Sequence, residues 1–424
     1  MRGSRRTFFL SSLALFASAS VCAQTFFWDF EGPNGLDGWY RSDGAPLQTS
    51  AGLASGTSVK VPSNNSPSPL FIYHEVPYNA TSGYLATCWS RSLVANSAGW
   101  NLRFAWIVSG GQSYWGGNAV TGSNTTEAWI AMEHSDILTY NYGGTFAIII
   151  EFSSSVPQDN WVDNVEVTIL PANTPILSVQ VLLGGNVAID GTSMTDGLRA
   201  TGQVPLAEPY SALGYPQFAG GGGETCIPGL FDASIFWPGV DWVRIELRSA
   251  SNPSTIVATR QAVVDRYGNV RDHNGDTRLV FNVPMGDYHV AIRHRNHLGC
   301  MTAVPKTFAV WDYPPGEGVS FSTPATATWG IGARKIVGST ALLWPGDANG
   351  DGVIKYAGVN NDRDLVLQAI GGVVPTNTLN NVYDRRDLNL DGIVKYTGTG
   401  NDRDVILESI GGAVPTNTRV QQLP

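Results

Sequence analysis

The chain has 424 residues, which is long enough for two to four domains whose cores need no disulfide support. Its formal net charge is −9. Its acidic balance without a basic cluster argues against nucleic-acid binding, because phosphates need Lys and Arg opposite them. After the N-terminal segment, no stretch approaches the ~18 apolar residues of a membrane-spanning helix, so we expect no transmembrane segment.

The N-terminus has the features of a secretory signal peptide. Three arginines among the first six residues precede the apolar run FFLSSLALFASASV, and the small-residue site Val21-Cys22-Ala23 follows. We predict that residues 1–23 are removed by cleavage near Ala23. The mature chain is then secreted, either to the extracellular space or to the cell surface. Val21 is a poor residue before a lipidated cysteine, which favours a released protein over a lipoprotein.

The body of the chain is predicted to be mostly β, with two sandwich domains. Period-two alternation marks strands in FAIIIEF, NVEVTI, VRIELR and YHVAIRH. In VRIELR we expect Val243, Ile245 and Leu247 to face a core and the charged residues between them to face water. Breaks at LPANTP and LLWPGD divide the chain into 24–170, an Ig-like antiparallel β-sandwich at 176–343, and a small module at 344–424.

The first domain resembles a known group of secreted β-domains. FFWDFEGPNGLDGWY and NWVDNVEVTI resemble the opening and closing strands of jelly-roll domains, which include carbohydrate-binding modules and adhesin domains of haemagglutinin-like surface proteins. The resemblance implies a jelly-roll-like β-sandwich in which Glu31 and Asp163, with Asp29 as a further candidate, share one structural Ca²⁺. Ordinary carboxylates at strand edges are the alternative explanation of these residues.

Eight of the thirteen tryptophans lie in this first domain. Indole rings stack on the apolar faces of sugars, and they also fill cores well. In SGGQSYWGGN, turn residues surround Tyr114 and Trp115 and should expose them. These two are the predicted ligand-binding residues, for a glycan or another cell-surface ligand.

Three cysteines remain after signal-peptide removal, an odd number in an oxidising compartment. Cys226 and Cys300 fall in one predicted domain and are the disulfide candidate. Three unpaired buried thiols are the alternative, because a free cysteine packs as a small hydrophobe.

The second domain resembles the domain that precedes C-terminal repeats in secreted bacterial proteins labelled haemagglutinin-like, a resemblance that implies no chemistry. Its RHRNHLG segment offers one metal hypothesis, in which His294 and His297 bind zinc together with Asp272 or His273. A polar, hydrogen-bonded turn at the end of a strand explains the same residues and is favoured.

The C-terminal module contains the same segment twice, as GDANGDGVIKYAGVNNDRDLVLQAIGG and DLNLDGIVKYTGTGNDRDVILESIGG. Oxygen-bearing side chains at loop positions 1, 3 and 5, Gly at 6 and a backbone carbonyl at 7 are typical of a loop around one hard cation, and calcium suits it better than magnesium or zinc. The predicted ligands are Asp347, Asn349, Asp351 and Val353 in the first copy, and Asp387, Asn389, Asp391 and Ile393 in the second.

The pattern departs from an EF-hand after position 7, because Lys occupies position 9 and Gly position 12. In both copies the sequence NDRD follows and leads into an apolar, helix-like run that ends at Gly-Gly. We therefore predict a lengthened loop with Asp364 and Asp404 as closing ligands. Asp362 and Asp402 are predicted helix N-caps or additional ligands.

A duplicated calcium loop followed by a short helix resembles the dockerin modules of secreted polysaccharide-degrading proteins. The resemblance implies a small helical module with about two Ca²⁺ and a cohesin-like scaffold protein as partner. The inserted KYxGxxN stretch and the lack of an obvious polar recognition pair depart from that pattern. A structural or anchoring role for the module fits equally well.

Three functions remain open from the sequence. No GxSxG elbow or HExxH helix occurs, which favours non-catalytic carbohydrate binding or adhesion, and we assign no catalytic residue. A glycosidase needs only two suitably placed carboxylates, which spacing does not reveal, so an enzyme of a polysaccharide-degrading system is the alternative. A purely structural surface protein is the third possibility.

Overall fold

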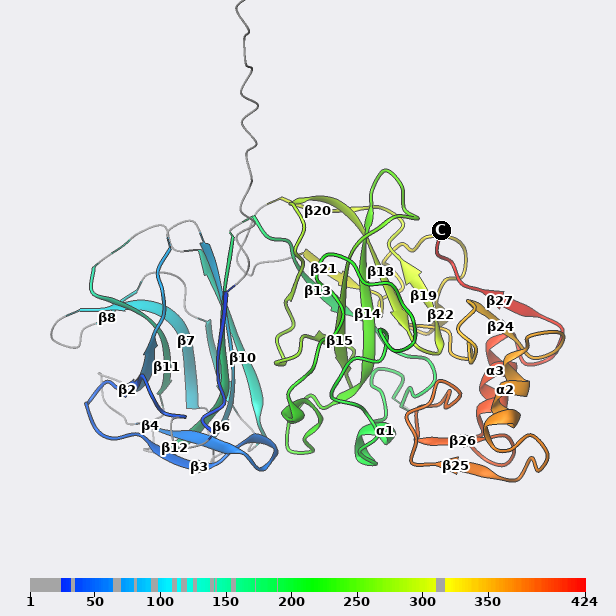
Figure 1. Cartoon of the computed structure of the whole chain (residues 1–424), viewed down its shortest axis with the longest axis horizontal. Coiled ribbons are helices and arrows are strands. Elements are labelled where there is room, and N and C mark those ends of the chain that lie inside the picture. Colours follow the sequence, from blue (N-terminus) through cyan, green and yellow to red (C-terminus); the bar gives the residue numbers. More distant parts are fainter. Residues whose placement is uncertain are drawn as a thin grey trace, which may run out of the picture.

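The computed structural model describes residues 24–31, 35–63, 70–79, 82–92, 98–108, 113–115, 120–124, 128–137, 141, 143–153, 158–171, 173–188, 190–309 and 317–424. The predicted signal peptide lies outside this part of the chain. Figure 1 shows a β-sandwich, a second β-rich part and a smaller C-terminal module arranged in a row. The described structure is mostly β, as predicted.

Two antiparallel sheets form the first β-sandwich, which confirms the predicted sandwich. One sheet has the order β10-β6-β12-β4-β3, with β1 also paired to β12. Its strands are β1 (Gln24–Trp28), β3 (Gln48–Ala51), β4 (Thr57–Ser63), β6 (Ser82–Ser92), β10 (Ile130–Ile137) and β12 (Gln158–Pro171). The other has the order β2-β5-β11-β7-β8, with β9 also paired to β7. Its strands are β2 (Trp39–Arg41), β5 (Phe71–Glu75), β7 (Ala98–Ile107), β8 (Ser113–Trp115), β9 (Val120–Asn124) and β11 (Thr145–Ser153).

The strand β11 explains why FAIIIEF reads as a nearly continuous apolar run. Ile148 and Ile150 face the core between the two sheets, where they join Phe104 and Val162. Ile149, on the opposite face, packs in a separate small cluster. Both faces of the strand are therefore buried, and the alternation expected for a strand with one wet face is weak there.

The second β-rich part packs a three-stranded sheet on a six-stranded one. The smaller sheet has the order β17-β13-β21, with β13 (Ile176–Gln180), β17 (Leu279–Val280) and β21 (Glu317–Ser320). The larger has the order β16-β15-β14-β18-β19, with β20 also paired to β18. Its strands are β14 (Gly239–Ser249), β15 (Ile256–Asp265), β16 (Val270–Arg271), β18 (Gly286–His294), β19 (His297–Met301) and β20 (Lys306–Phe308). A hairpin of β22 (Lys335–Val337) and β23 (Thr340–Leu342) follows. Because β13 and β21 are parallel, this part is not the purely antiparallel sandwich that we predicted.

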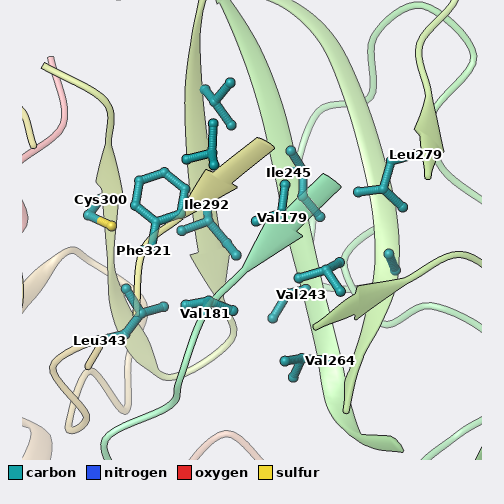
Figure 2. Packing of buried hydrophobic residues seen from close by; sticks show 14 of the residues in the cluster. Val179, Val181, Val243, Ile245, Val264, Leu279, Ile292, Cys300, Phe321 and Leu343 are labelled. Carbon is teal, nitrogen blue, oxygen red and sulfur yellow. The ribbon is translucent and has the colours of Figure 1, made fainter. Parts of the chain in front are cut away.

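Figure 2 shows the core between these sheets, where Val179 and Val181 face Val243, Ile245 and Ile292. The apolar half of the VRIELR prediction is confirmed.

The charged half of that prediction is wrong, because Arg244, Glu246 and Arg248 are at most 2% exposed. Glu246 lies 3.0 Å from the Nε of Arg244 and 2.6 Å from the Nη2 of Arg248. The side chain of Arg244 also bonds to Gln217 and to the backbone of Pro216. A long segment of the same domain therefore covers the face of β14 that was expected to meet water.

This covering segment contains the short helices α1 (Gly197–Ala200) and η2 (Pro228–Phe231), and it joins the two β-rich parts. Trp89 and Trp129 of the first sandwich pack in one cluster with Tyr210, Leu230 and Trp242. The indole nitrogen of Trp89 donates to the carbonyl of Asn274 at 3.0 Å. Leu53, in the 3-10 helix η1 (Leu53–Ser55), joins the same cluster. These tryptophans are core residues of a domain junction.

The C-terminal module is built from two matching halves. Its elements are β24 (Val353–Lys355), α2 (Asp362–Ala369), β25 (Thr378–Asn380), β26 (Ile393–Lys395), α3 (Asp402–Ser409) and β27 (Thr418–Val420). β24 pairs with β27 and β25 with β26, so each half completes a ribbon of the other. Equivalent residues such as Ile354 and Val394, or Val366 and Ile406, share one core, which also contains Leu298 of the preceding domain. None of the helices in the described ranges combines the length and apolar character needed to cross a membrane.

The predicted disulfide between Cys226 and Cys300 is wrong. Both thiols are free and buried, and they lie in two different hydrophobic clusters. Burial raises the pKa of each thiol to about 12. The alternative of unpaired buried thiols therefore holds for both, and protonated thiols are unreactive.

Candidate metal centres and ligand face

In the first repeat, two buried aspartates face the same loop. Asp347 accepts hydrogen bonds from the backbone N–H groups of Gly350 at 2.7 Å and Gly352 at 3.0 Å. Asp362, the first residue of α2, accepts from the N–H groups of Ala348 and Lys355, both at 2.8 Å. Both aspartates are at most 5% exposed.

The second repeat has the same geometry. Asp387 accepts from the N–H of Gly392 at 2.9 Å, and Asp402 accepts from those of Leu388 at 2.6 Å and Lys395 at 2.7 Å. Both aspartates are fully buried. The two repeats therefore share most of these contacts. They differ at one, because Asp387 accepts from the N–H of Asp391 at 3.2 Å where Asp347 accepts from that of Gly350.

The pKa values of the buried loop carboxylates are raised, chiefly by burial. Burial raises the pKa of Asp362 to about 7, and the nearby carboxylate of Asp347 adds to the effect. Burial likewise raises the pKa of Asp387 to about 7 and that of Asp402 well above its usual range. Among the described residues, no Lys or Arg side chain bonds to Asp362 or Asp402. Buried charges need a paired or coordinated partner, and oxygen ligands of this kind suit Ca²⁺.

The predicted closing ligands are corrected by the helix geometry. Asn361 is the N-cap of α2 and accepts from the N–H of Asp364 at 2.9 Å. The carboxylate of Asp364 bonds back to Asn361 and to Arg363, each at 2.8 Å, and is about half exposed. Asp404 does the same with Asn401 and Arg403 in α3. These aspartates serve the helix N-termini, because each bonds to the side-chain amide of the N-cap three residues before it.

The middle of each loop is closed by turns. The carboxylates of Asp351 and Asp391 accept from the N–H of Val353 and Ile393, and the amides of Asn349 and Asn389 donate to them. Within the described residues, no three His, Cys, Asp or Glu side chains form a ready metal cluster. The structure thus brings together the first and last acidic residues of each loop. It leaves the middle aspartates in turn hydrogen bonds.

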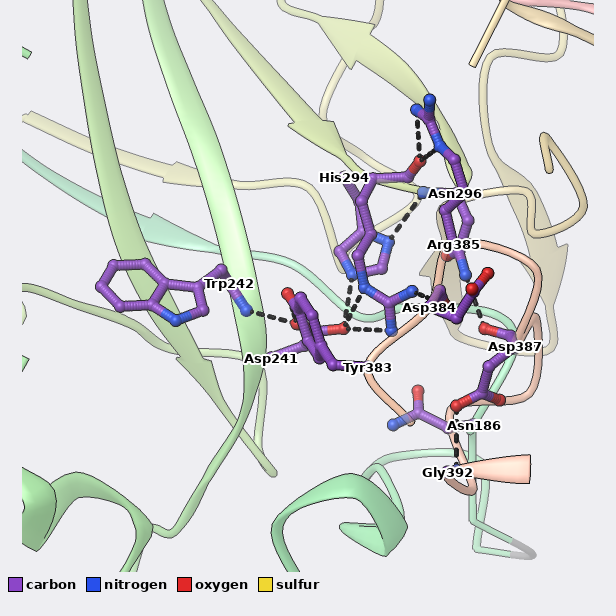
Figure 3. Close-up of polar contacts among 12 residues, drawn as sticks. Asn186, Asp241, Trp242, His294, Asn296, Tyr383, Asp384, Arg385, Asp387 and Gly392 are labelled. Atoms are coloured by element: carbon purple, nitrogen blue, oxygen red, sulfur yellow. Dashed lines mark hydrogen bonds and ion pairs between the residues drawn. The ribbon is translucent and has the colours of Figure 1, made fainter. Parts of the chain in front are cut away.

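The turn at 294–297 of the second β-rich part lies against both loops, because Asn296 bonds to the backbone of Asp347 and of Asp387. Figure 3 shows the side at the second loop. Asp241 is fully buried and contacts His294 Nε2 at 3.0 Å, Arg295 Nε at 3.1 Å and the hydroxyl of Tyr383 at 2.6 Å. Burial opposes ionisation, but Arg295 and His294 hold the pKa of Asp241 well below its usual range. This network fastens the repeat module to the preceding domain.

The zinc hypothesis is wrong for the four residues named. The Nδ1 atoms of His294 and His297 lie 2.9 Å apart in the turn just described. Asp272 and His273 lie instead at the junction with the first sandwich, where Asp272 pairs with Arg260 at 2.6 Å. The favoured explanation, a hydrogen-bonded polar turn, is confirmed.

The residues implied by the jelly-roll resemblance do come together. The short loop of residues 52–57 lies against both Glu31 and Asp163, since the N–H of Leu53 donates to Asp163 at 2.8 Å and that of Thr57 donates to Glu31. Burial raises the pKa of Asp163 to about 7, and Glu31 and Asp29 raise it further. Three carboxylates therefore lie close enough to repel one another, which also fits a cation.

Two aromatic side chains on β2 and β5 form a partly exposed surface of the first sandwich. The rings of Tyr40 and Tyr73 are 5.4 Å apart, and Tyr40 is 51% exposed. A cavity of about 350 Å³ next to them is also lined by Trp39 and Arg41. Sequence reasoning missed this pair, because two tyrosines on separate strands leave no spacing signal. The side chains of Tyr114 and Trp115, the predicted ligand residues, lie outside the described part of the structure.

No protein-family model and no curated protein sequence matches the chain. Among solved structures, a CBM4 protein aligns at 14% identity over 32% of this chain and 96% of that chain, with a TM-score of 0.26. The CBM22-1 xylan-binding domain from Paenibacillus barcinonensis aligns at 16% identity over 35% and 94%, with a TM-score of 0.26. An arabinose-bound α-L-arabinofuranosidase aligns at 14% identity over 32% of this chain and only 24% of that one, with a TM-score of 0.28. At such values, the functional assignment rests on the residues of this chain.

Proposed function

We propose that this chain is a secreted, calcium-binding protein that binds carbohydrate without catalysing a reaction, or that serves in adhesion. The observation that carries the proposal is the pair of buried aspartates at the ends of each repeat loop. Each pair would hold one Ca²⁺: the first between Asp347 and Asp362, and the second between Asp387 and Asp402. Asn349, Asp351 and the carbonyl of Val353, with their equivalents in the second copy, would complete the shells after a local adjustment of the turns.

A third cation is proposed between Glu31 and Asp163. Its support is the loop of residues 52–57, which is held by both carboxylates. Gly52 and Gly56 permit this approach, because a Cβ at either position would lie 2.4–2.5 Å from a carboxylate oxygen. A cation here would offset the repulsion between the carboxylates and stiffen the junction with the second domain, to which Leu53 contributes.

Calcium binding is tested by calorimetry on residues 24–424 after chelator treatment. The double variant Asp362→Asn/Asp402→Asn should lose binding in the repeats, since both buried end carboxylates are neutralised. Asp364→Asn/Asp404→Asn is the matched control and should bind like the parent, because these side chains serve the helix caps. Parent protein that takes up no Ca²⁺ would refute the calcium proposal.

Carbohydrate binding is proposed for the face around Tyr40 and Tyr73. Tyr40 is an exposed aromatic ring beside a cavity, and such rings stack on the apolar face of a sugar. Arg41, which also lines the cavity, is paired with Asp43 at 2.6 Å, and this pair would offer polar contacts to sugar hydroxyls. Tyr40→Ala should abolish retention on the polysaccharides that the parent binds. Trp329→Ala, which removes another exposed aromatic from a different domain, should leave retention unchanged.

The enzyme and the structural surface protein remain the competing functions. Release of reducing sugar from a polysaccharide panel would favour the enzyme. Self-association without any glycan binding would favour the structural protein. A cohesin-like partner stays a prediction of the dockerin resemblance, to be tested by co-purification with a cohesin domain in the presence and absence of Ca²⁺.

A further inference from the structure

The two repeat loops are not equivalent in their surroundings. Asp351 of the first loop is exposed, whereas its counterpart Asp391 is half-buried. The second loop packs against residues 184–203 of the preceding domain. A Cβ on Gly185 would lie 2.1 Å from the carbonyl oxygen of Leu388, and one on Gly392 would lie 3.1 Å from the hydroxyl of Thr201.

The two copies also differ in sequence at loop position 4. The first copy has Gly350 there and the second has Leu390, both with positive φ (75° and 58°). Leu390 is 1% exposed and belongs to the core of the second β-rich part, together with Met194 and Leu198. The second loop is therefore anchored in a neighbouring domain, although its backbone conformation is one that favours glycine.

Asn186 lies in the segment that covers this loop and has an unpartnered oxygen. The residue is 4% exposed, and its Nδ2 donates to the carbonyl of Thr195 at 2.8 Å. That bond fixes the orientation of the amide, because only the nitrogen end can donate. Its Oδ1 is buried and accepts no hydrogen bond within the described residues. Figure 3 shows Asn186 close to the second loop, and its chain neighbour Gly185 packs on Leu388, the residue after Asp387.

We infer that Asn186 supplies an oxygen ligand to the cation of the second loop, so that this site is shared between the repeat module and the preceding domain. A buried oxygen without a donor is unfavourable, and a cation bound in the adjacent loop would remove that cost. Asn side-chain carbonyls are ordinary ligands of Ca²⁺. The first loop has no such neighbour at the described residues. The inference rests on the proposed calcium binding and adds a cross-domain ligand to it.

The test measures Ca²⁺ alone by calorimetry on residues 24–424, with one loop disabled at a time. In an Asp347→Asn/Asp362→Asn background, which leaves the second loop, Asn186→Ala should weaken binding about tenfold or more. In an Asp387→Asn/Asp402→Asn background, which leaves the first loop, Asn186→Ala should change nothing. A single cooperative melting transition in chelator for each Asn186→Ala derivative shows that the variant folds, at a lower temperature because the bond to Thr195 is lost.

The variant Asn186→Asp distinguishes a role of Asn186 as a metal ligand from a purely structural role. It keeps an oxygen but loses the amide donor to Thr195, so a ligand role predicts that affinity in the second loop is retained. Equal losses for Asn186→Asp and Asn186→Ala would overturn the inference in favour of the Thr195 bond. Unchanged affinity in Asn186→Ala would also overturn it while leaving the calcium proposal intact. A parent protein that binds no Ca²⁺ would overturn both.

Discussion

The side-chain amide of Asn296 donates to the backbone carbonyl of Asp387 at 2.6 Å. The backbone carbonyl of the same Asn296 accepts from the N–H groups of Gly346 and Asp347 at 3.0 and 3.1 Å. One residue of the preceding domain therefore holds the first position of both repeat loops. Arg385 strengthens this link, since it donates to the carbonyls of Arg295 and Asn349. The repeat module is part of a continuous structure with that domain.

Replacing Asn296 with Ala should destabilise the protein by about 1–3 kcal/mol, because the carbonyl of Asp387 loses its donor in a buried place. Urea unfolding of residues 24–424, followed by the fluorescence of the tryptophans, measures the change. Asn252→Ala, in an exposed turn, is the control and should be within about 0.5 kcal/mol of the parent. Equal stabilities for the two variants would show that the link at Asn296 carries no free energy.

At position 390, a Gly variant should be more stable than an Ala variant, which is the reverse of the usual order of stability. Truncation to Ala costs the buried side chain, about 2–5 kcal/mol, and keeps the left-handed strain. Truncation to Gly costs the same burial but relieves about 1–2 kcal/mol of that strain. Leu390→Gly should therefore be the more stable of the two variants in thermal unfolding. A more stable Leu390→Ala would mean that the positive φ of this residue costs nothing.

Glu246 should contribute strongly to the stability of the second β-rich part. Its carboxylate is shared by Arg244 and Arg248, which are buried with it, and by Arg293 at 3.2 Å. Glu246→Gln leaves buried guanidinium groups without a counter-charge, which costs about 3–5 kcal/mol. Denaturant unfolding measures it. Glu75→Gln, at an exposed strand end, is the comparison and should have little effect.

The junction between the first two domains should weaken at alkaline pH. His273 contacts Glu166 at 3.0 Å and Asp272 at 3.2 Å. Burial opposes its charge, but these two carboxylates raise its pKa to about 10, above the ordinary 6.5. A raised pKa contributes stability that is complete below about pH 6.5 and is lost as the pH rises through 10.

Melting temperatures between pH 6 and pH 10 provide the measurement. The parent should lose more stability over this range than His273→Gln, which has no charge to lose. Parallel pH profiles for the two proteins would contradict the raised pKa.

Several features could be predicted from the sequence because they depend on order along the chain. Period-two alternation located the strands that carry Val243, Ile245 and Leu247, and their burial is confirmed. The repeated Asp, Asn and Gly spacing located two matching loops and two following helices. Asp347 and Asp387 were identified by this spacing, and both are buried at the start of their loops.

Other features were decided only by tertiary structure. Spacing could not tell whether Asp362 or Asp364 turns toward the loop, because the choice depends on where the helix begins and which residue caps it. It predicted water around Arg244 and Glu246, since a period of two does not reveal a distant segment that folds over the outer face. It could not bring the segment of Asn186 to the second loop, because residues far apart in sequence meet only in the folded chain, where Gly185 packs on Leu388.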